Sequence, residues 1–141
     1  MPQSLASIYV HCVFSTKGRL DTITDPPDLH RQIGGISKRI DCQPLIVGGT
    51  KNHVHVLAVL GRTITVADWV KEIKRVSSVG RPDLAWQSGY GAFSVGKEQV
   101  EVVCAYIANQ EEHHRKVDFE AEYRRLLAEQ GIEWDERYVW D

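Results

Sequence analysis

The stretch "CQPLIVGGTKNHVHVLAVL", residues 42–60, decides the fold. It holds two short runs of β-forming residues, 42–50 and 53–60, and the turn-rich letters "GGTKN" link them. A link of this length and composition is typical of a β-hairpin, in which the two strands pair antiparallel. We therefore predict a hairpin near the middle of the chain.

The segments on both sides of the hairpin have the apolar spacing of helices. Residues 24–42 begin with Asp25 and two prolines, and residues 63–80 offer Thr65 as an N-cap before an apolar stripe. A β-type run lies within residues 4–16, and a shorter one lies at about 92–95. The order β-α-β-β-α-β predicts an α+β domain, with a ferredoxin-like (RRM-like) antiparallel sheet and helices packed on one face.

The C-terminal part of the chain has helical periodicity. Val100, Val103, Cys104 and Ile107 recur at steps of three and four residues, which predicts a helix at about 98–115. A last helix is expected at about 117–130, and Gly131 ends it. With no internal repeat or obvious linker, we expect residues 1–141 to form a single domain.

Charge is unevenly distributed along the sequence. The net charge is −2. Residues 1–97 carry 12 Lys and Arg against 7 Asp and Glu, whereas residues 98–141 carry 5 against 12. This asymmetry indicates either a basic face with an acidic tail or two ordinary solvated surfaces.

The sequence lacks the pattern of a membrane or secreted protein. No apolar run approaches the roughly 18 residues that a membrane helix needs, and the N-terminal residues do not read as a secretory leader. We therefore expect a cytoplasmic protein with no membrane segment.

The hairpin's second strand contains the motif His-x-His. Side chains at positions i and i+2 of a strand point to the same face, so His53 and His55 are expected to lie together. Two neutral imidazoles on one face can share a divalent cation. The alternatives are a surface pair beside the turn, or one histidine in the core and one exposed.

A second motif lies on the predicted helix at about 98–115. Tyr106 and Gln110 are four residues apart, and they therefore share a helix face. His113 shares that face too, and His114 follows it. We interpret the two histidines as a polar helix end or a phosphate contact rather than as a further metal site.

Basic residues form several short clusters that are candidates for binding DNA: Lys17, Arg19, Lys51, Lys71, Lys74 and Arg75. Such clusters bind phosphate backbones through counterion release, whatever the base sequence. Trp69, Trp86, Tyr90 and Phe93 could stack on unpaired bases, or they could be core residues.

Taken in order, the motifs resemble those of one family. His-x-His on a strand, followed about fifty residues later by Tyr-x-x-x-Gln on a helix, resembles the HUH-type single-tyrosine transposases of the insertion sequence 200/605 family. The resemblance covers nearly the whole chain. It includes "YVHCVFSTKGR", "HRQIGGI", "NHVHVLAVL", "VKEIKRVSS", "WQSGYGAFSVG" and "VCAYIANQEEHHRK".

The resemblance implies a role for each motif. His53 and His55 match the metal-binding histidines, Tyr106 matches the nucleophile, and Gln110 matches the third ligand. Lys74 falls where the family has a basic residue near DNA. The implied activity is that of a transposase, which cleaves and rejoins single-stranded DNA at hairpin-forming element ends through a 5′-phosphotyrosine.

The implied cofactor and partners follow from the same resemblance and from the ligand types. Ligands of N and O type suit Mg²⁺ or Mn²⁺, and imidazole favours Mn²⁺. The family forms homodimers, in which the tyrosine helix can serve the partner subunit. Whether this active site is built in cis or in trans stays open at this level, as does the hairpin sequence.

Two other functions are compatible with the sequence. One is a domesticated relative that processes repeated hairpins in its host genome. The other is a non-catalytic ferredoxin-like module that binds nucleic acid and in which the histidines are incidental.

Overall fold

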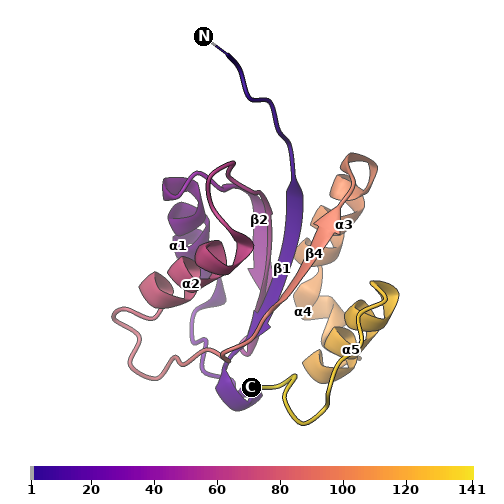
Figure 1. Cartoon of the computed structure of the whole chain (residues 1–141). Helices are drawn as coiled ribbons and strands as arrows, with labels where there is room; N and C mark the ends of the chain where they lie inside the picture. Colours follow the sequence, from indigo (N-terminus) through magenta and orange to yellow (C-terminus); the bar gives the residue numbers. More distant parts are fainter. Residues whose placement is uncertain (1) are drawn as a thin grey trace.

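Over residues 2–141, the part of the chain that the computed structural model describes, the centre is an antiparallel sheet of four strands. The strands β1 (Tyr9–Ser15), β2 (Gln43–Gly49), β3 (His53–Val59) and β4 (Gly91–Val95) lie in the order β2-β3-β1-β4 (Figure 1). The helix α1 (Pro26–Arg39) links β1 to β2, and α2 (Val66–Ser77) links β3 to β4. This is the split βαβ arrangement, so the predicted hairpin and α+β ferredoxin-like fold are confirmed.

The two central strands give the sheet two different buried faces. Cys12 pairs with Val56 in the β1–β3 register, and Val13 pairs with His55. Because side chains alternate along a strand, Cys12 and Val56 point to one face while Val13 and His55 point to the other. Nearly every residue of β1 and β3 is buried, so both faces of the sheet need a cover.

Helices α1 and α2 cover the apolar face of the sheet. Asp25 caps α1 before its two prolines, and Thr65 caps α2, as the sequence predicts. Their apolar stripes pack with the strand residues in one core cluster, which includes Phe14, Leu29, Ile33, Val56, Trp69 and Ile73. The indole nitrogen of Trp69 donates a hydrogen bond of 2.9 Å to Ser37, so its polar group is satisfied inside this core.

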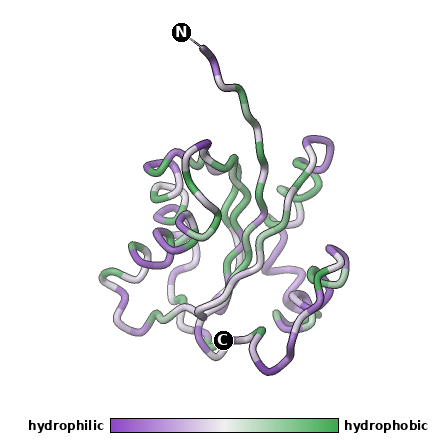
Figure 2. Tube along the Cα trace, in the orientation of Figure 1, coloured by the Kyte–Doolittle hydropathy of each residue, from purple (hydrophilic) through white to green (hydrophobic). Residues whose placement is uncertain are grey.

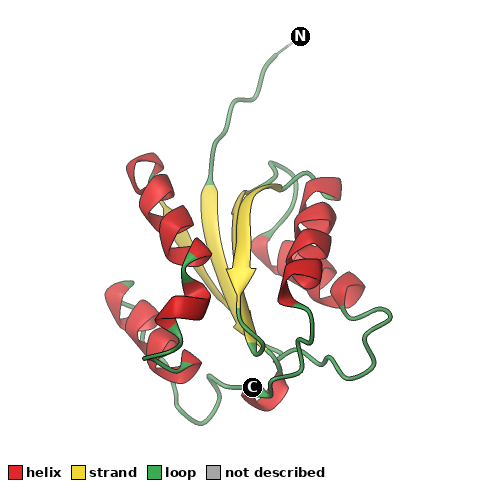
Figure 3. Ribbon diagram, turned by 180° about the vertical axis from the view of Figure 1, so that it is seen from behind, coloured by secondary structure: helices red, strands yellow, loops and turns green. Residues whose placement is uncertain are grey.

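The opposite face carries helices as well. These are α3 (Val100–Ala108), α4 (Gln110–His113) and α5 (Phe119–Glu129), and they lie across the sheet from α1 and α2 (Figure 3). The prediction of helices on one face therefore holds for α1 and α2 but leaves out this second layer. The physical reason is that Val13 and Phe93 bury apolar surface on this face against Phe119 and Tyr123 of α5.

The helix expected at about 98–115 is two shorter helices in the structure. The 3-10 turn Lys97–Gln99 precedes α3, and α3 ends at Ala108, before the C-cap Asn109, whose ψ of 18° departs from helical geometry. The next residue, Gln110, begins α4. The chain is therefore bent between Tyr106 and Gln110, although both residues still reach the same region of the sheet.

Gly48 allows α3 to lie close to the sheet. A β-carbon at this position would lie 2.5 Å from the backbone oxygen of Ile107, which is closer than real contacts allow. Any side chain larger than hydrogen would push α3 outward. Gly48, which belongs to the predicted turn, therefore also determines how closely α3 approaches β2.

The hydropathy of the residues follows this layering. The strands are mostly hydrophobic, whereas the helices alternate between hydrophobic and hydrophilic residues along their length (Figure 2). Within residues 2–141, no helix has both the length and the apolar character needed to cross a membrane.

Candidate active site

The two histidines of β3 form the centre of the candidate site. His53 and His55 project from the same face, as their spacing predicts, and their ring centroids lie 5.2 Å apart. Both side chains are fully buried on the face that α3, α4 and α5 cover. The interpretation as a surface pair is therefore wrong, and so is that of one core and one exposed histidine. Two buried imidazoles need polar partners, and the structure provides them.

Contacts on one nitrogen of each ring fix its orientation. Nδ1 of His53 lies 2.8 Å from Oδ1 of Asn52 and 3.1 Å from Oγ1 of Thr50. Nδ1 of His55 lies 2.8 Å from Nε2 of His11, which is on β1 and on the same face. An imidazole held at one nitrogen presents the other nitrogen to a ligand, as is usual at protein metal sites. The two Nε2 atoms therefore face the interior of the site.

Tyr106 and Gln110 reach the histidines from α3 and α4. Oε1 of Gln110 lies 2.8 Å from Nε2 of His53. The ring centroid of Tyr106 lies 5.7 Å from that of His55, and its hydroxyl donates a hydrogen bond to Glu122. Nη2 of Arg125 donates a hydrogen bond of 3.1 Å to the same hydroxyl. The prediction that Tyr106 and Gln110 share a face is confirmed.

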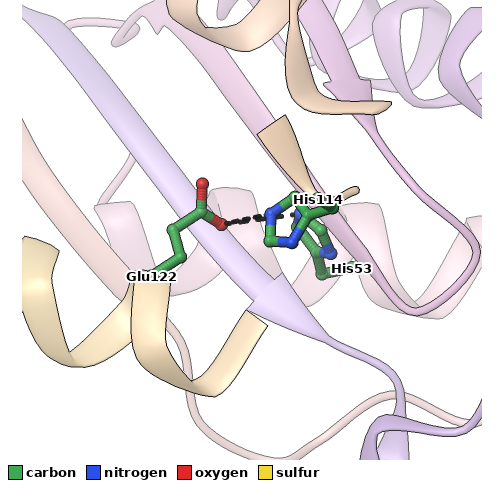
Figure 4. Close-up of side chains that lie close together, drawn as sticks. All are labelled: His53, His114 and Glu122. Carbon is green, nitrogen blue, oxygen red and sulfur yellow. Dashed lines mark hydrogen bonds and ion pairs between the residues drawn. The ribbon is translucent and has the colours of Figure 1, made fainter. Parts of the chain in front are cut away.

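Glu122 on α5 was not predicted as a site residue, although its carboxylate lies beside His53 and His114 (Figure 4). Its carboxylate is fully buried. Oε1 lies 3.2 Å from Nε2 of His55 and 3.6 Å from Nε2 of His53, and Oε2 accepts a hydrogen bond of 2.9 Å from Nε2 of Gln110. One feature of the sequence could have identified Glu122. It is a charged residue within the apolar stripe of α5, three residues after Phe119.

The histidines at the end of α4 lie at different depths. Nε2 of His114 is 3.0 Å from Oε1 of Gln110 and 3.0 Å from Oε1 of Glu122, so its ring belongs to the cluster. His113 is more exposed, and its Nε2 lies 3.5 Å from Oε2 of Glu122 without a hydrogen bond. The sequence placed both at a polar helix end, and α4 does end there. Their contact with phosphate stays a prediction.

Burial keeps His11 and His53 neutral, whereas the carboxylate of Glu122 stays charged. Desolvation, with a smaller effect of His55, lowers the pKa of both His11 and His53 to about 3. Burial alone would raise the pKa of Glu122, but hydrogen bonds from His114 and His55 outweigh it and hold that pKa well below its usual range. Burial and the hydrogen bond to Glu122 raise the pKa of the Tyr106 hydroxyl well above its ordinary value. The site thus holds a buried carboxylate beside the neutral imidazole of His53.

The spacing of the donor atoms suits a divalent cation. Ligand atoms of His53, His114 and Glu122 all lie within 4.8 Å of one another, Oε1 of Gln110 contacts His53 and His114, and Nε2 of His55 contacts Glu122. These contacts run from 2.8 to 3.6 Å. Two ligands that each lie about 2.1 Å from a cation, at a right angle, are about 3.0 Å apart. The residues present therefore fit a cation of the Mg²⁺ or Mn²⁺ size.

Two cavities border the cluster. One, of about 330 Å³, lies between β4, α3 and α5, and its lining includes Tyr106 and Arg125. The other, of about 540 Å³, is lined by residues of the β2–β3 turn and of the segment after α4, including Lys51, His114 and Arg115. Tyr106 and His114 thus line these cavities, whereas His53 and His55 are fully buried behind them.

The basic residues predicted to bind DNA fall into two groups. One group lies where β1 ends and in the β2–β3 turn, close to His53: Lys17, Arg19 and Lys51. The other lies on α2, which covers the opposite face of the sheet: Lys71, Lys74 and Arg75. The contact of each with DNA stays a prediction. On the histidine side, Arg19 lies 4.0 Å from Glu120 of α5, and Lys51 lines a cavity with His114.

Lys74 has a structural role in addition to its predicted one. Its ammonium group donates hydrogen bonds to the backbone oxygens of Gln87, Ser88 and Gly89, at 2.8, 3.2 and 2.8 Å. Desolvation lowers the pKa of Lys74 to about 8. An ammonium group has three N–H donors, and Lys74 uses all three to hold the loop before β4 in place.

Comparisons with known proteins agree with the fold. The sequence profile of the family described as "Transposase IS200 like" matches residues 4–110. A candidate transposase from Deinococcus radiodurans has a similar structure, with a TM-score of 0.60 and 19% identity over 78% of this chain and 98% of that one. A REP-associated tyrosine transposase bound to a REP hairpin is similar too, with a TM-score of 0.60 and 14% identity over 83% and 76%. No curated protein matches the sequence significantly.

Proposed function

This chain belongs to the IS200-like transposase family, and on that premise we propose that it cleaves and rejoins single-stranded DNA with Tyr106 as the nucleophile. The proposal rests on one observation above all. The Tyr106 hydroxyl lies in the same buried cluster as the two histidines of the His-x-His motif, within a single chain. A nucleophile and a set of cation ligands beside each other are what phosphodiester cleavage requires.

In the proposed reaction Tyr106 attacks a DNA phosphate. Its Oη forms a bond to phosphorus, the bond from phosphorus to the 3′ oxygen breaks, and the phosphate stays on the tyrosine as a 5′-phosphotyrosine. The tyrosine gives up its proton, and the departing strand gains one to end in a 3′-hydroxyl. Attack of a 3′-hydroxyl on the phosphotyrosine is the same step in reverse, so strands can be rejoined without another energy source.

The remaining residues hold the reacting groups. His53, His55 and Gln110 are the proposed ligands, and Mg²⁺ or Mn²⁺ held there would polarise the phosphoryl oxygens and offset the charge of the transition state. Asn52 and His11 orient the two imidazoles. Arg125 directs its guanidinium at the Tyr106 hydroxyl and could contact the phosphate.

The proposed substrate is single-stranded DNA at hairpin-bearing element ends. The similar REP-associated transposase is bound to a REP hairpin, which supports a hairpin substrate here. Lys51, which lines a cavity with His114, offers positive charge for the DNA backbone, and Lys17 is a further candidate. We propose a homodimer that works in the cytoplasm, but each chain supplies its own Tyr106 and its own histidines.

The test is covalent capture of DNA by Tyr106. Labelled single-stranded DNA with the hairpins that flank the gene is incubated with the protein and Mn²⁺ or Mg²⁺, and the adduct is resolved on a denaturing gel. We expect an adduct with the wild type and with the control Tyr138→Phe, because Tyr138 lies exposed in the C-terminal segment. EDTA or Tyr106→Phe should abolish it. An adduct that persists in Tyr106→Phe would overturn the assignment of the nucleophile.

The same experiment separates the other functions. Hairpin binding with no adduct under any metal would support the non-catalytic module. An adduct with dispersed genomic hairpins, but none with ends that flank the gene itself, would support a domesticated relative that processes repeats.

A further inference from the structure

Glu122 is an unusual residue for its position on α5. Its neighbours on the same helix face are Phe119, Tyr123 and Leu126, all buried in an apolar cluster. An ionised carboxylate is very unfavourable in such surroundings unless other groups compensate its charge. Its presence therefore calls for a partner with positive charge.

No lysine or arginine forms an ion pair with Glu122 among residues 2–141. Its ion-pair partners in this part of the chain are all histidines: His53, His55, His113 and His114. The nearby guanidinium of Arg125 pairs with Glu129 instead. A divalent cation among the imidazoles would provide the missing charge.

The two oxygens of the carboxylate face different groups. Oε1 points to the imidazoles, with Nε2 of His114 at 3.0 Å and Nε2 of His55 at 3.2 Å. Oε2 accepts the hydrogen bond from the Tyr106 hydroxyl and one of 2.9 Å from Gln110. One oxygen thus lies among the cation ligands, and the other holds the nucleophile.

We propose that Glu122 binds the catalytic cation through Oε1 and orients Tyr106 through Oε2, and that His114 is a third imidazole ligand of the same cation. The inference rests on the proposed function, because it assigns further ligands to the same site. The inference goes beyond the proposed function because it places two ligands, His114 and Glu122, after residue 110, where the match to the family profile ends. The α4–α5 segment is then part of the metal site.

This ligand set makes a selectivity prediction. Three imidazole nitrogens, an amide oxygen and a carboxylate oxygen leave little room for the several waters that Mg²⁺ usually keeps. Divalent transition metals accept imidazole more readily than Mg²⁺ does. The protein should therefore bind Mn²⁺ at least tenfold more tightly than Mg²⁺.

Binding of the metal alone tests the ligand assignment. Bound Mn²⁺ loses the six-line electron paramagnetic resonance signal of the free ion, so titration of the full chain without DNA gives its affinity. Glu122→Gln, which keeps the side-chain shape, and His114→Ala should each weaken Mn²⁺ binding at least tenfold. Glu120→Gln is the matched control, because Glu120 lies on α5 but outside the cluster. It should bind as the wild type does.

Either site variant that is folded by circular dichroism but binds Mn²⁺ within twofold of the wild type would overturn its residue as a ligand. If Glu122→Gln does not fold, His114→Ala still decides whether the α4–α5 segment contributes to the site. The reverse selectivity, with Mg²⁺ bound as tightly as Mn²⁺, would overturn the three-imidazole site.

Adduct formation at saturating Mn²⁺ tests the second role of Glu122. A glutamine offers one acceptor oxygen and cannot serve both the cation and Tyr106. When the metal site is saturated, the rate of adduct formation by Glu122→Gln should stay at least tenfold below that of the wild type. Under the same condition the rate for His114→Ala should return to the wild-type value. Full recovery of Glu122→Gln would overturn the orienting role. If the wild type forms no adduct at all, the proposed function is wrong. The Mn²⁺ titration still shows whether Glu122 and His114 are ligands.

Discussion

His11 supports the site without facing its centre. It holds Nδ1 of His55 and is itself almost wholly buried. A neutral His11 can accept a hydrogen bond from Nδ1–H of His55, which leaves the lone pair of the His55 Nε2 free to bind a cation. Desolvation, which lowers the pKa of His11 to about 3, keeps it in this neutral form.

The buried histidines predict how stability depends on pH. In the unfolded chain a histidine takes up a proton near pH 6.5, whereas His11 and His53 in the folded chain stay neutral down to about pH 3. The unfolded state binds more protons in this range, so the free energy of unfolding falls as the pH is lowered from 6.5 towards 3. Glu122 acts in the same direction at lower pH, because its folded pKa is depressed.

We expect a loss of about 2 kcal/mol between pH 7 and pH 5.5, measured by urea unfolding in EDTA. The variant His11→Asn, if it folds, should show a smaller dependence on pH. Equal stability of the wild type at the two pH values would contradict the neutral, buried state of these rings.

At the scale of elements, the height of α3 over the sheet decides whether Tyr106 and Gln110 reach the histidines. Gly48→Ala would place a β-carbon against the backbone oxygen of Ile107, and α3 would have to move. We expect a loss of about 1–3 kcal/mol in the free energy of unfolding, together with weaker Mn²⁺ binding and less adduct.

Gly35→Ala is the matched control for this change. A β-carbon there meets no atom within 4 Å, and the residue lies inside α1, where alanine is favoured over glycine. This variant should be as stable as the wild type or more so. If Gly48→Ala behaves in the same way, the close approach of α3 is not what positions the two side chains.

At the scale of the whole molecule, one chain contains both halves of the site. The histidines come from the central hairpin, while Tyr106, Gln110 and Glu122 come from the layer of helices that follows β4. His53 contacts Gln110, and both His55 and Tyr106 contact Glu122 within one chain. We therefore expect that a homodimer carries two complete sites rather than two shared ones.

Mixing two inactive variants tests this arrangement. His55→Ala lacks an imidazole and Tyr106→Phe lacks the nucleophile, so a shared site would regain both groups in a mixed dimer. After co-expression of the two variants, we expect adduct no higher than either gives alone. Restored adduct would show that the tyrosine helix serves the partner subunit.

The sequence by itself determined the elements and the faces of the motifs. The order of the strands and helices follows from local periodicity, as do the caps Asp25 and Thr65, but the division of the helix expected at about 98–115 does not. The shared face of His53 and His55 follows from the geometry of any strand. The pairing of Tyr106 with Gln110 was also predictable, because four residues separate them on a helical segment.

Only the tertiary structure decided which groups complete the site. His11 lies 44 residues from His55 in the sequence, and Glu122 lies 67 residues from it. Local periodicity says which face of a helix or strand a residue occupies, but not which distant element packs against that face. The second layer of helices had to be placed on the sheet before a buried glutamate in an apolar stripe could be recognised as part of a metal site.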